Sequence, residues 1–78
     1  MRHANSFYKI SRREQEVLHL TAQEYTINEI ATELYISSHT AISHRKNLML
    51  KLDVKNMAGL VRKGFELGFL KISQEVNN

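Results

Sequence analysis

The sequence predicts an all-α fold in which four helices form one small bundle. Proline is absent from the 78 residues and the three glycines all lie at or after residue 59, so the turn signals that separate β-strands are missing from most of the chain. Cysteine is absent too, which leaves apolar packing to hold the fold without disulfides or thiolate-bound metal. A chain of this length buries only about 60–65% of its unfolded surface, and one layer of helices is the simplest way to do so.

The first predicted helix runs from Arg12 to about Gln23. Ser11 and Glu14 form a capping box, in which the hydroxyl and the carboxylate each accept a hydrogen bond from a backbone N–H that would otherwise lack a partner. An apolar stripe follows at helical spacing, made by Val17, Leu18, Thr21 and Ala22.

The second predicted helix is short, from about residue 27 to residue 35. Thr26 and Glu29 repeat the capping box. The apolar residues that follow at i, i+3, i+4 and i+7 are Ile27, Ile30, Ala31 and Leu34.

The third predicted helix spans about Ser38 to Leu52. It follows residues 37–40, whose hydroxyl groups favour N-caps. Only three or four residues separate it from the second helix, so the two helices must cross steeply, which predicts a helix-turn-helix motif at about residues 27–46. On a helical wheel the residues expected to face the core are Ala41, Leu48 and Leu52.

The fourth predicted helix begins after Asn56, an N-cap residue, and ends near Gly68, which can adopt the left-handed conformation. Four apolar or small residues can supply the side packed on the other helices: Leu60, Val61, Gly64 and Leu67. Phe65 is then left at the solvent edge, with Met57 or Ala58 one or two turns before it.

Charge is distributed unevenly along the chain. The stretch from Glu14 to Glu33 holds five glutamates and no lysine or arginine, whereas Arg45 to Lys63 holds six basic residues against Asp53 alone. The two stretches therefore carry formal charges of −5 and +5 (six minus one) within a net charge of +3. Either a positive face for a polyanion or a pair of ordinary solvated helix faces explains this pattern.

The outer face of the third helix favours the polyanion. Its residues are His39, Ser43, Lys46, Asn47 and Leu50, with Ile42, Met49, His44, Lys51 and Arg45 towards the flanks. No carboxylate lies on this helix, although an ordinary surface helix mixes both signs of charge. The DNA major groove is about 12 Å wide and admits one helix, so phosphates and base edges are the expected partners and Lys46 is the first candidate for a base contact.

The hydroxyl groups of Ser37, Ser38 and Thr40 lie where a helix N-terminus can hold phosphate. Simple helix capping explains the same residues equally well, and the two roles can coexist.

One set of segments is spaced through all four predicted helices. The segments are 10–18 (ISRREQEVL), 28–31 (NEIA), Leu34, 36–37, Thr40, 44–45, 51–52, Val54, Asn56 and 66–70 (ELGFL). Together they resemble the LuxR-type DNA-binding domain, also called the GerE or NarL type. The resemblance covers residues 6–71 and implies a four-helix bundle, the third helix as the recognition helix, the fourth as a dimer contact, and homodimeric binding to inverted repeats.

The resemblance also implies roles for particular side chains. The base-reading positions correspond to Ile42, Ser43 and Lys46. The phosphate-contacting set is Ser37, Ser38, His39, Thr40, Arg45, Asn47 and Lys51. The dimer contacts expected on the fourth helix are Met57, Ala58 and Phe65. The domain is expected to need no cofactor, metal or small-molecule ligand, with double-stranded DNA as its partner, RNA polymerase as a candidate partner, and the cytoplasm as its location.

The chain departs from the family pattern at three positions. Ile42 stands where the family often has lysine or arginine, so contact with a thymine methyl group is expected there instead of a charged contact. Glu24 and Asp53 stand where the family often has glycine after a helix, and glutamate tolerates the left-handed conformation less well than aspartate. A strained or altered turn is therefore expected at Glu24.

The sequence leaves three alternative functions to consider. Enzymatic catalysis would depend on the four histidines, but His39 and His44 diverge around their helix, and His3 and His19 lack the partners that a catalytic or metal site needs. A helical protein-interaction module and a promoter-binding domain like region 4 of a sigma factor remain open. Residues 1–5 and 72–78 are expected to be flexible tails.

Overall fold

The structure is a computed structural model that describes residues 9–72, and within this range it holds four helices and no strand. They are α1 (Arg12–Ala22), α2 (Ile27–Leu34), α3 (Ser38–Leu52) and α4 (Met57–Glu66). The predicted all-α fold is confirmed. The predicted tails, residues 1–5 and 72–78, lie outside the described residues except for Ile72, as do residues 6–8.

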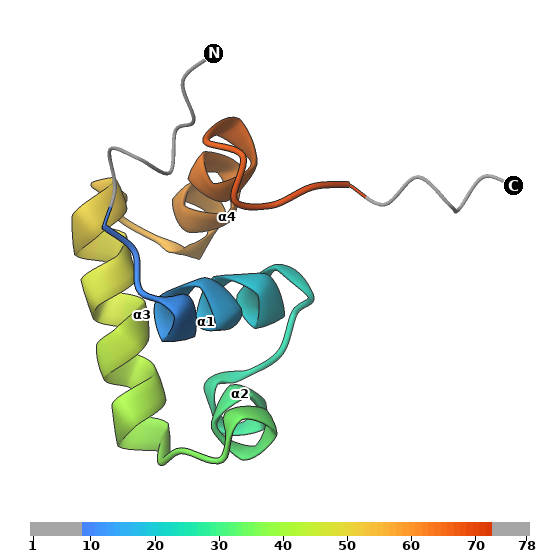
Figure 1. Cartoon of the computed structure of the whole chain (residues 1–78), viewed down its shortest axis with the longest axis vertical. Helices are drawn as coiled ribbons and strands as arrows, with labels where there is room; N and C mark the ends of the chain where they lie inside the picture. The colour runs from blue at the N-terminus through green and yellow to red at the C-terminus, as the bar shows by residue number, and fades with distance from the viewer. Residues whose placement is uncertain (1–8, 73–78) are drawn as a thin grey trace, which may run out of the picture.

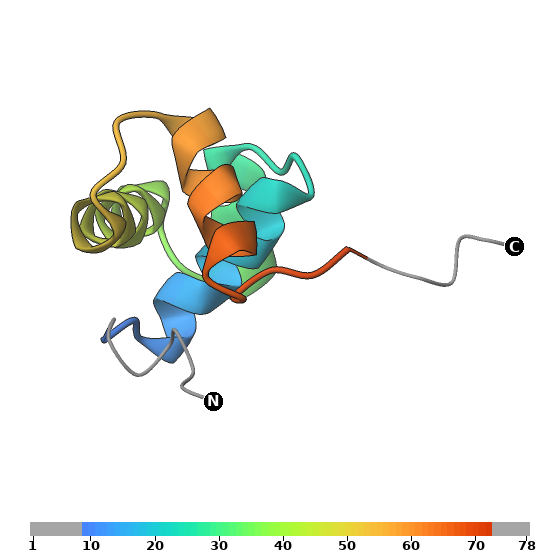
Figure 2. The same ribbon diagram turned by 90° about the horizontal axis from the view of Figure 1, so that it is seen from above.

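The longest helix, α3, forms one side of the molecule (Figure 1). Helix α1 lies across its middle, α2 lies near its N-terminal end, and α4 lies near its C-terminal end. Three residues, 35–37, connect α2 to α3, and the two helices cross steeply, as expected for a helix-turn-helix. Seen from above, α1, α2 and α4 all lie on the same side of α3 (Figure 2).

Each helix begins at the residue that the caps predict. Both capping boxes are present: the N–H of Glu14 donates to Ser11 Oγ at 3.0 Å, and that of Glu29 donates to Thr26 Oγ1 at 3.2 Å. Ser37 caps α3 and Asn56 caps α4 through their side-chain oxygens. The starts are therefore fixed by local hydrogen bonds.

All four helices are followed by a residue in the left-handed conformation. Gly68 has φ of 85° after α4, where the N–H of Phe69 donates to the carbonyl of Gly64 at 2.9 Å, so it ends the helix as predicted. Glu24 (φ 70°) and Asp53 (φ 57°) adopt this conformation without being glycine. The strain expected at Glu24 is thus present, and such a conformation costs about 1–2 kcal/mol per residue.

The core consists of two apolar clusters that α3 joins. One contains Leu18, Leu48, Leu52, Leu60, Phe69 and Leu70, and the other contains Val17, Ile30, Ala31 and Ala41. The three residues of α3 predicted to face the core are all buried: Ala41, Leu48 and Leu52. Helix α3 is therefore fixed to the bundle along one face, and its opposite face is free to meet a partner.

Two further properties concern the described range as a whole. None of the helices in residues 9–72 has the length and apolar character needed to cross a bilayer. No three histidine, aspartate or glutamate side chains in that range gather into a group that could hold a metal ion.

Candidate nucleic-acid interface

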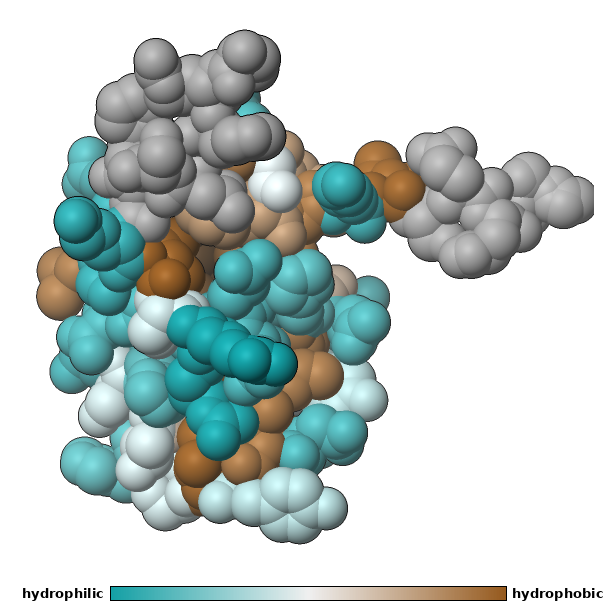
Figure 3. Space-filling model, viewed as in Figure 1, coloured by the Kyte–Doolittle hydropathy of each residue, from teal (hydrophilic) through white to brown (hydrophobic). Residues whose placement is uncertain are grey.

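The side of α3 that faces away from the other helices is exposed along its length. The exposed side chains are His39, Ile42, Ser43, Lys46, Asn47 and Leu50. Helix α3 has 15 residues and no carboxylate, and its length of about 22 Å suits a groove of the DNA duplex. The edge of the molecule that α3 forms is mostly hydrophilic, with a small hydrophobic patch (Figure 3).

The three predicted base-reading residues lie together on this face. Ile42, Ser43 and Lys46 are all exposed, at i, i+1 and i+4 of one helix. Leu50 follows Lys46 by about one turn and is 78% exposed. An apolar side chain this exposed adds no stability to the core, but it can contact a sugar or a thymine methyl group.

The hydroxyl groups at the N-terminal end of α3 already have partners within the chain. Ser37 Oγ accepts from the N–H of Thr40 at 3.0 Å and donates to Thr40 Oγ1 at 2.9 Å. Ser38 Oγ donates to Asn28 Oδ1 at 2.6 Å, which ties the start of α3 to α2. The capping role is present, and a hydroxyl oxygen that donates one hydrogen bond can still accept or exchange another.

A charged network joins the C-terminal end of α3 to the start of α1. Lys51 Nζ donates to Glu14 Oε1 at 2.8 Å and to the carbonyl of Lys9 at 2.7 Å. The same Glu14 oxygen accepts from the N–H of Ser11 at 3.0 Å, and Glu14 is only 5% exposed. The ammonium of Lys51, a predicted phosphate contact, is therefore already engaged by a carboxylate, whereas Arg45 is half-buried without an ion pair of this kind among the described residues.

The network sets the charge of Glu14. Burial by itself would raise the pKa of this carboxyl group, but the hydrogen bond and charge of Lys51, the N–H of Ser11 and the charge of His44 outweigh burial and hold the pKa below its usual value. Glu14 is consequently ionised at neutral pH.

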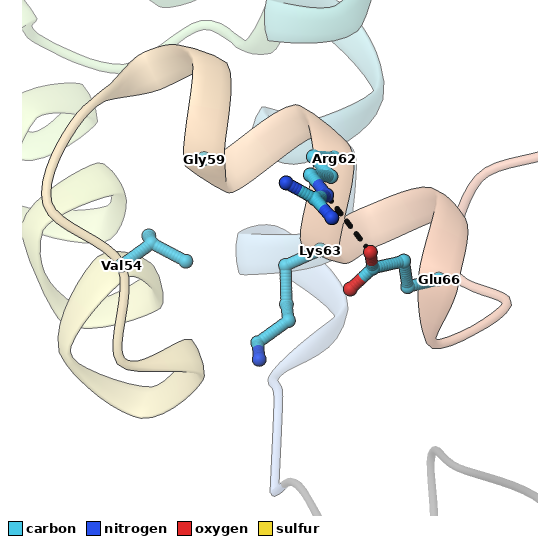
Figure 4. A pocket seen from close by; sticks show the side chains of 5 residues that line it. All are labelled: Val54, Gly59, Arg62, Lys63 and Glu66. Atoms are coloured by element: carbon cyan, nitrogen blue, oxygen red, sulfur yellow. Dashed lines mark hydrogen bonds and ion pairs between the residues drawn. The ribbon is translucent and has the colours of Figure 1, made fainter.

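The predicted dimer contacts on α4 differ in exposure. Ala58 is exposed and Phe65 is 40% exposed, as predicted, whereas Met57 is half-buried and packs against the core. Beside them a surface depression of about 320 Å³ is lined by Val54, Gly59, Arg62, Lys63 and Glu66 (Figure 4). Arg62 Nε donates to Glu66 Oε2 there at 2.9 Å, so much of this surface is charged.

Sequence reasoning missed three features of the site. The ties between Asn28 and Ser38 and between Glu14 and Lys51 join residues 10 and 37 positions apart, and no local pattern signals such pairs. Tyr35, in the turn between α2 and α3, is left-handed (φ 59°) and 95% exposed. Only the short connection could have hinted that this residue must reverse the chain direction.

The chain is similar to bacterial regulatory proteins. The sequence profile of the luxR family of these proteins matches residues 9–63. The spore germination protein GerE of Bacillus subtilis (strain 168) is 40% identical over 63 residues, which are 81% of this chain and 85% of GerE. The transcriptional regulatory protein UhpA of Escherichia coli (strain K12) is 42% identical over 57 residues, which are 73% of this chain but only 29% of UhpA.

Solved structures give the same result. The transcription factor GerE superposes with a TM-score of 0.74 at 30% identity, over 78% of this chain and 91% of GerE. The response regulator ChrA of a heme-sensing two-component system superposes with a TM-score of 0.75 at 26% identity, over 78% of this chain and 30% of ChrA. The chain thus spans most of GerE and less than a third of UhpA and of ChrA.

Proposed function

The chain belongs to the luxR family of bacterial regulatory proteins as a helix-turn-helix DNA-binding domain, and we propose that it reads DNA sequence by placing α3 in the major groove. One observation carries the proposal: the exposed face of α3 is free of carboxylates, and the other three helices lie on its opposite side. A duplex can therefore approach α3 without meeting the rest of the bundle.

Three side chains read bases in this proposal. Lys46 donates to the O6 and N7 acceptors of a guanine, Ser43 bonds to a base edge on either side of a pair, and Ile42 contacts a thymine methyl group. All three lie in the first three turns of α3, from which a recognition helix reaches base edges.

Phosphates are held at both sides of the groove. Ser37, Ser38, His39 and Thr40 lie at the N-terminus of α3, where the free N–H groups and the helix dipole favour an anion. Further along the helix, Arg45 and Asn47 contact the sugar–phosphate backbone of the DNA. Lys51, the last residue of the predicted set, has its ammonium engaged by Glu14 and is left out of this phosphate contact.

We further propose that two copies bind an inverted repeat and meet through α4. Ala58 and Phe65 supply the contact, with Met57 at its inner edge. Relatives named as response regulatory and transcriptional regulatory proteins support a role in transcription regulation. RNA polymerase as a partner and the cytoplasm as the place of action belong to the same proposal.

Selection from random double-stranded DNA tests the proposal directly. We expect the bound fragments to share an inverted repeat whose half-sites lie about 34 Å apart centre to centre, or a multiple of this distance. Affinity for the selected duplex should fall steeply as salt rises, because phosphate contacts release counterions. Fragments without a shared sequence, or binding that ignores salt, would overturn the proposal and favour a protein-interaction module.

A further inference from the structure

Helices α1 and α3 meet through an apolar contact and through one polar network. The apolar part comes from Val17 and Leu18 on α1 and from the buried face of α3. The polar part is the Glu14–Lys51 ion pair, in which Glu14 lies in the first turn of α1 and Lys51 in the last turn of α3. The apolar contact and the ion pair constrain the position of α3 in different ways.

Apolar packing holds α3 against the bundle but is not directional. A small slide of α3 along its axis, or a small rotation about it, keeps most of the side chains of Ala41 and Leu48 away from water. A charge-assisted hydrogen bond is different, because its strength depends on distance and angle. Lys51 Nζ donates two such bonds, at 2.8 Å and 2.7 Å, and a move of about 1 Å directly away from an acceptor would lengthen that bond beyond hydrogen-bond distance.

The carboxylate that receives Lys51 is itself fixed. Glu14 Oε1 accepts the N–H of Ser11, and the N–H of Glu14 donates to Ser11 Oγ, so the capping box sets the rotamer of Glu14. His44, whose positive form also favours the ionised carboxylate, lies seven residues before Lys51 and so on the same side of α3. Lys51 therefore meets a carboxylate whose place is determined by α1.

An ion pair of this kind is weak evidence for stability. Taking the two charges out of water costs much of what their attraction returns, and a neutral pair of similar size is often as stable. Side-chain exposures of 6% for Glu14 and 38% for Lys51 show that the carboxylate is removed from water almost completely. A structural reason other than stability is therefore needed for the pair.

We propose that Glu14 and Lys51 are positioning residues for base reading: their ion pair fixes α3 along and about its axis, and Lys51 acts through Glu14 instead of neutralising a phosphate. This inference rests on the proposed DNA-binding function. Lys51 lies five residues beyond Lys46, about 7.5 Å along the helix, so a shift at Lys51 is transmitted to the reading side chains by a rigid rod.

The position of α3 matters because other elements meet the DNA or the second copy at the same time. The Ser38–Asn28 hydrogen bond places the N-terminal turn of α3 relative to α2. In the proposed dimer, α4 sets the distance between the two recognition helices. If α3 is shifted, the domain cannot make its contacts to the base edges, to the phosphates and to the second copy at the same time. Binding to the cognate sequence should suffer, whereas binding to DNA of any sequence should not.

A double-mutant cycle on DNA affinity tests the proposal. The variants are Glu14→Gln, Lys51→Met and the double variant, measured by gel shift against the duplex selected by the wild type and against a scrambled duplex of the same composition. Glutamine at position 14 keeps the capping box, and Lys55→Met is the matched control because it removes an exposed lysine outside the network. Thermal melts establish that each variant is folded at the binding temperature.

We expect each single variant to lower affinity for the selected duplex by about two- to thirtyfold. The double variant should bind that duplex at least as tightly as the single variant with the lower affinity. For Lys51→Met, affinity for the scrambled duplex and the salt dependence should match those of Lys55→Met, and for Glu14→Gln they should match those of the wild type. Lys51→Arg, which keeps the charge and the donors, should recover part of the loss seen in Lys51→Met.

Two results would overturn the proposal. If Lys51→Met weakens both duplexes equally and reduces the salt slope by about 0.9 relative to Lys55→Met, while Glu14→Gln binds like the wild type, Lys51 is a phosphate contact. If both single variants read the selected duplex as well as the wild type does, the pair has no role in reading. A wild type that fails to distinguish the two duplexes would instead refute the proposed function itself.

Discussion

In the proposed function, Lys46 is the residue on which direct reading of a base depends most. It is exposed in the middle of the carboxylate-free face of α3, and none of the ion pairs found in residues 9–72 involves it. Lys46→Ala should weaken binding to the selected duplex by about 1–3 kcal/mol, because a base-edge contact is lost. The melting temperature should stay unchanged, since the side chain packs against nothing in the core. Gel shifts and thermal melts measure the two quantities.

The matched control for Lys46 is Lys55, an exposed lysine in the connection between α3 and α4. Lys55→Ala should change affinity for the selected and the scrambled duplex by the same small factor. If Lys46→Ala binds the selected duplex as tightly as the wild type does, Lys46 does not belong to the reading surface.

Glu14 gives the fold a specific dependence on pH. Its pKa is lowered in the folded chain and is near the usual value of about 4.3 in the unfolded chain, so its contribution to stability is fully present above that usual value. The contribution is lost as the pH falls through the folded pKa, because the unfolded state then takes up the proton first. Urea unfolding between about pH 6 and about pH 3 should show a steeper loss of stability for the wild type than for Glu14→Gln. Equal slopes for the two proteins would show that the network does not stabilise the carboxylate.

At the scale of the helix, α3 is divided into a buried and an exposed face. Leu48 is fully buried and Leu50, two residues later, is 78% exposed. Leu48→Ala should lower the free energy of unfolding by about 2–5 kcal/mol through a cavity in the core, and DNA binding should be lost only where the chain unfolds. Leu50→Ala, the same change on the outer face, should cost no more than about 0.5 kcal/mol. Similar unfolding energies for the two variants, measured in urea, would contradict this division.

Helix α4 requires a glycine at one position and merely tolerates one at another. A Cβ atom on Gly64 would lie 2.7 Å from Leu70 Cδ1 and 3.3 Å from Leu18 Cδ2, and Leu70 is buried and cannot move aside freely. Gly64→Ala should therefore destabilise the fold by about 1–3 kcal/mol. On Gly59 the nearest atom would be Val54 Cβ at an ordinary 3.4 Å, so Gly59→Ala should gain up to about 1 kcal/mol of helix propensity. Chemical denaturation of both variants checks the opposite signs.

The helix starts show most clearly how much of the fold could be predicted from the sequence. The starts of all four helices could be predicted because a capping hydrogen bond spans only three residues, as from Ser11 to Glu14 or from Asn56 to Gly59. The exposed face of α3 followed from periodicity alone. The Glu14–Lys51 pair and the return of Phe69 and Leu70 to the core could not be predicted, because they depend on how the helices pack.

At the scale of the whole molecule, the acidic and basic stretches of the sequence lie on different helices. The acidic stretch forms α1 and α2, and the basic stretch forms most of α3 and α4. Some of the negative charge is neutralised within the chain, because Glu14 pairs with Lys51 and Glu16 pairs with Arg13 at 3.0 Å. In the proposed function, the carboxylate-free face of α3 attracts the DNA, and the glutamates of α1 and α2 help to orient the domain by repelling it.

In the proposed function, assembly on DNA depends on a small patch of α4. Phe65 is 40% exposed and Ala58, two turns before it, is exposed on the same face of the helix. A patch of one aromatic and one small side chain is far below the area that a stable dimer needs, so the domain should be monomeric at micromolar concentration. Two copies bound to the proposed inverted repeat would be held close together, and the same weak contact would then act at a high effective concentration.

Cooperativity on a two-site duplex is therefore the property that Phe65 should control. The wild type should bind two half-sites, whose recognition helices lie about 34 Å apart, more tightly than its affinity for a single half-site predicts. Phe65→Ser should reduce this cooperativity and leave the half-site affinity unchanged, because Phe65 lies on α4 and the reading residues lie on α3. Tyr25→Ser is the matched control, since Tyr25 is a similarly exposed aromatic (37%) outside α4 and should leave cooperativity intact. Gel shifts on one-site and two-site duplexes measure both quantities, and a wild type without cooperativity would mean that α4 only covers the core.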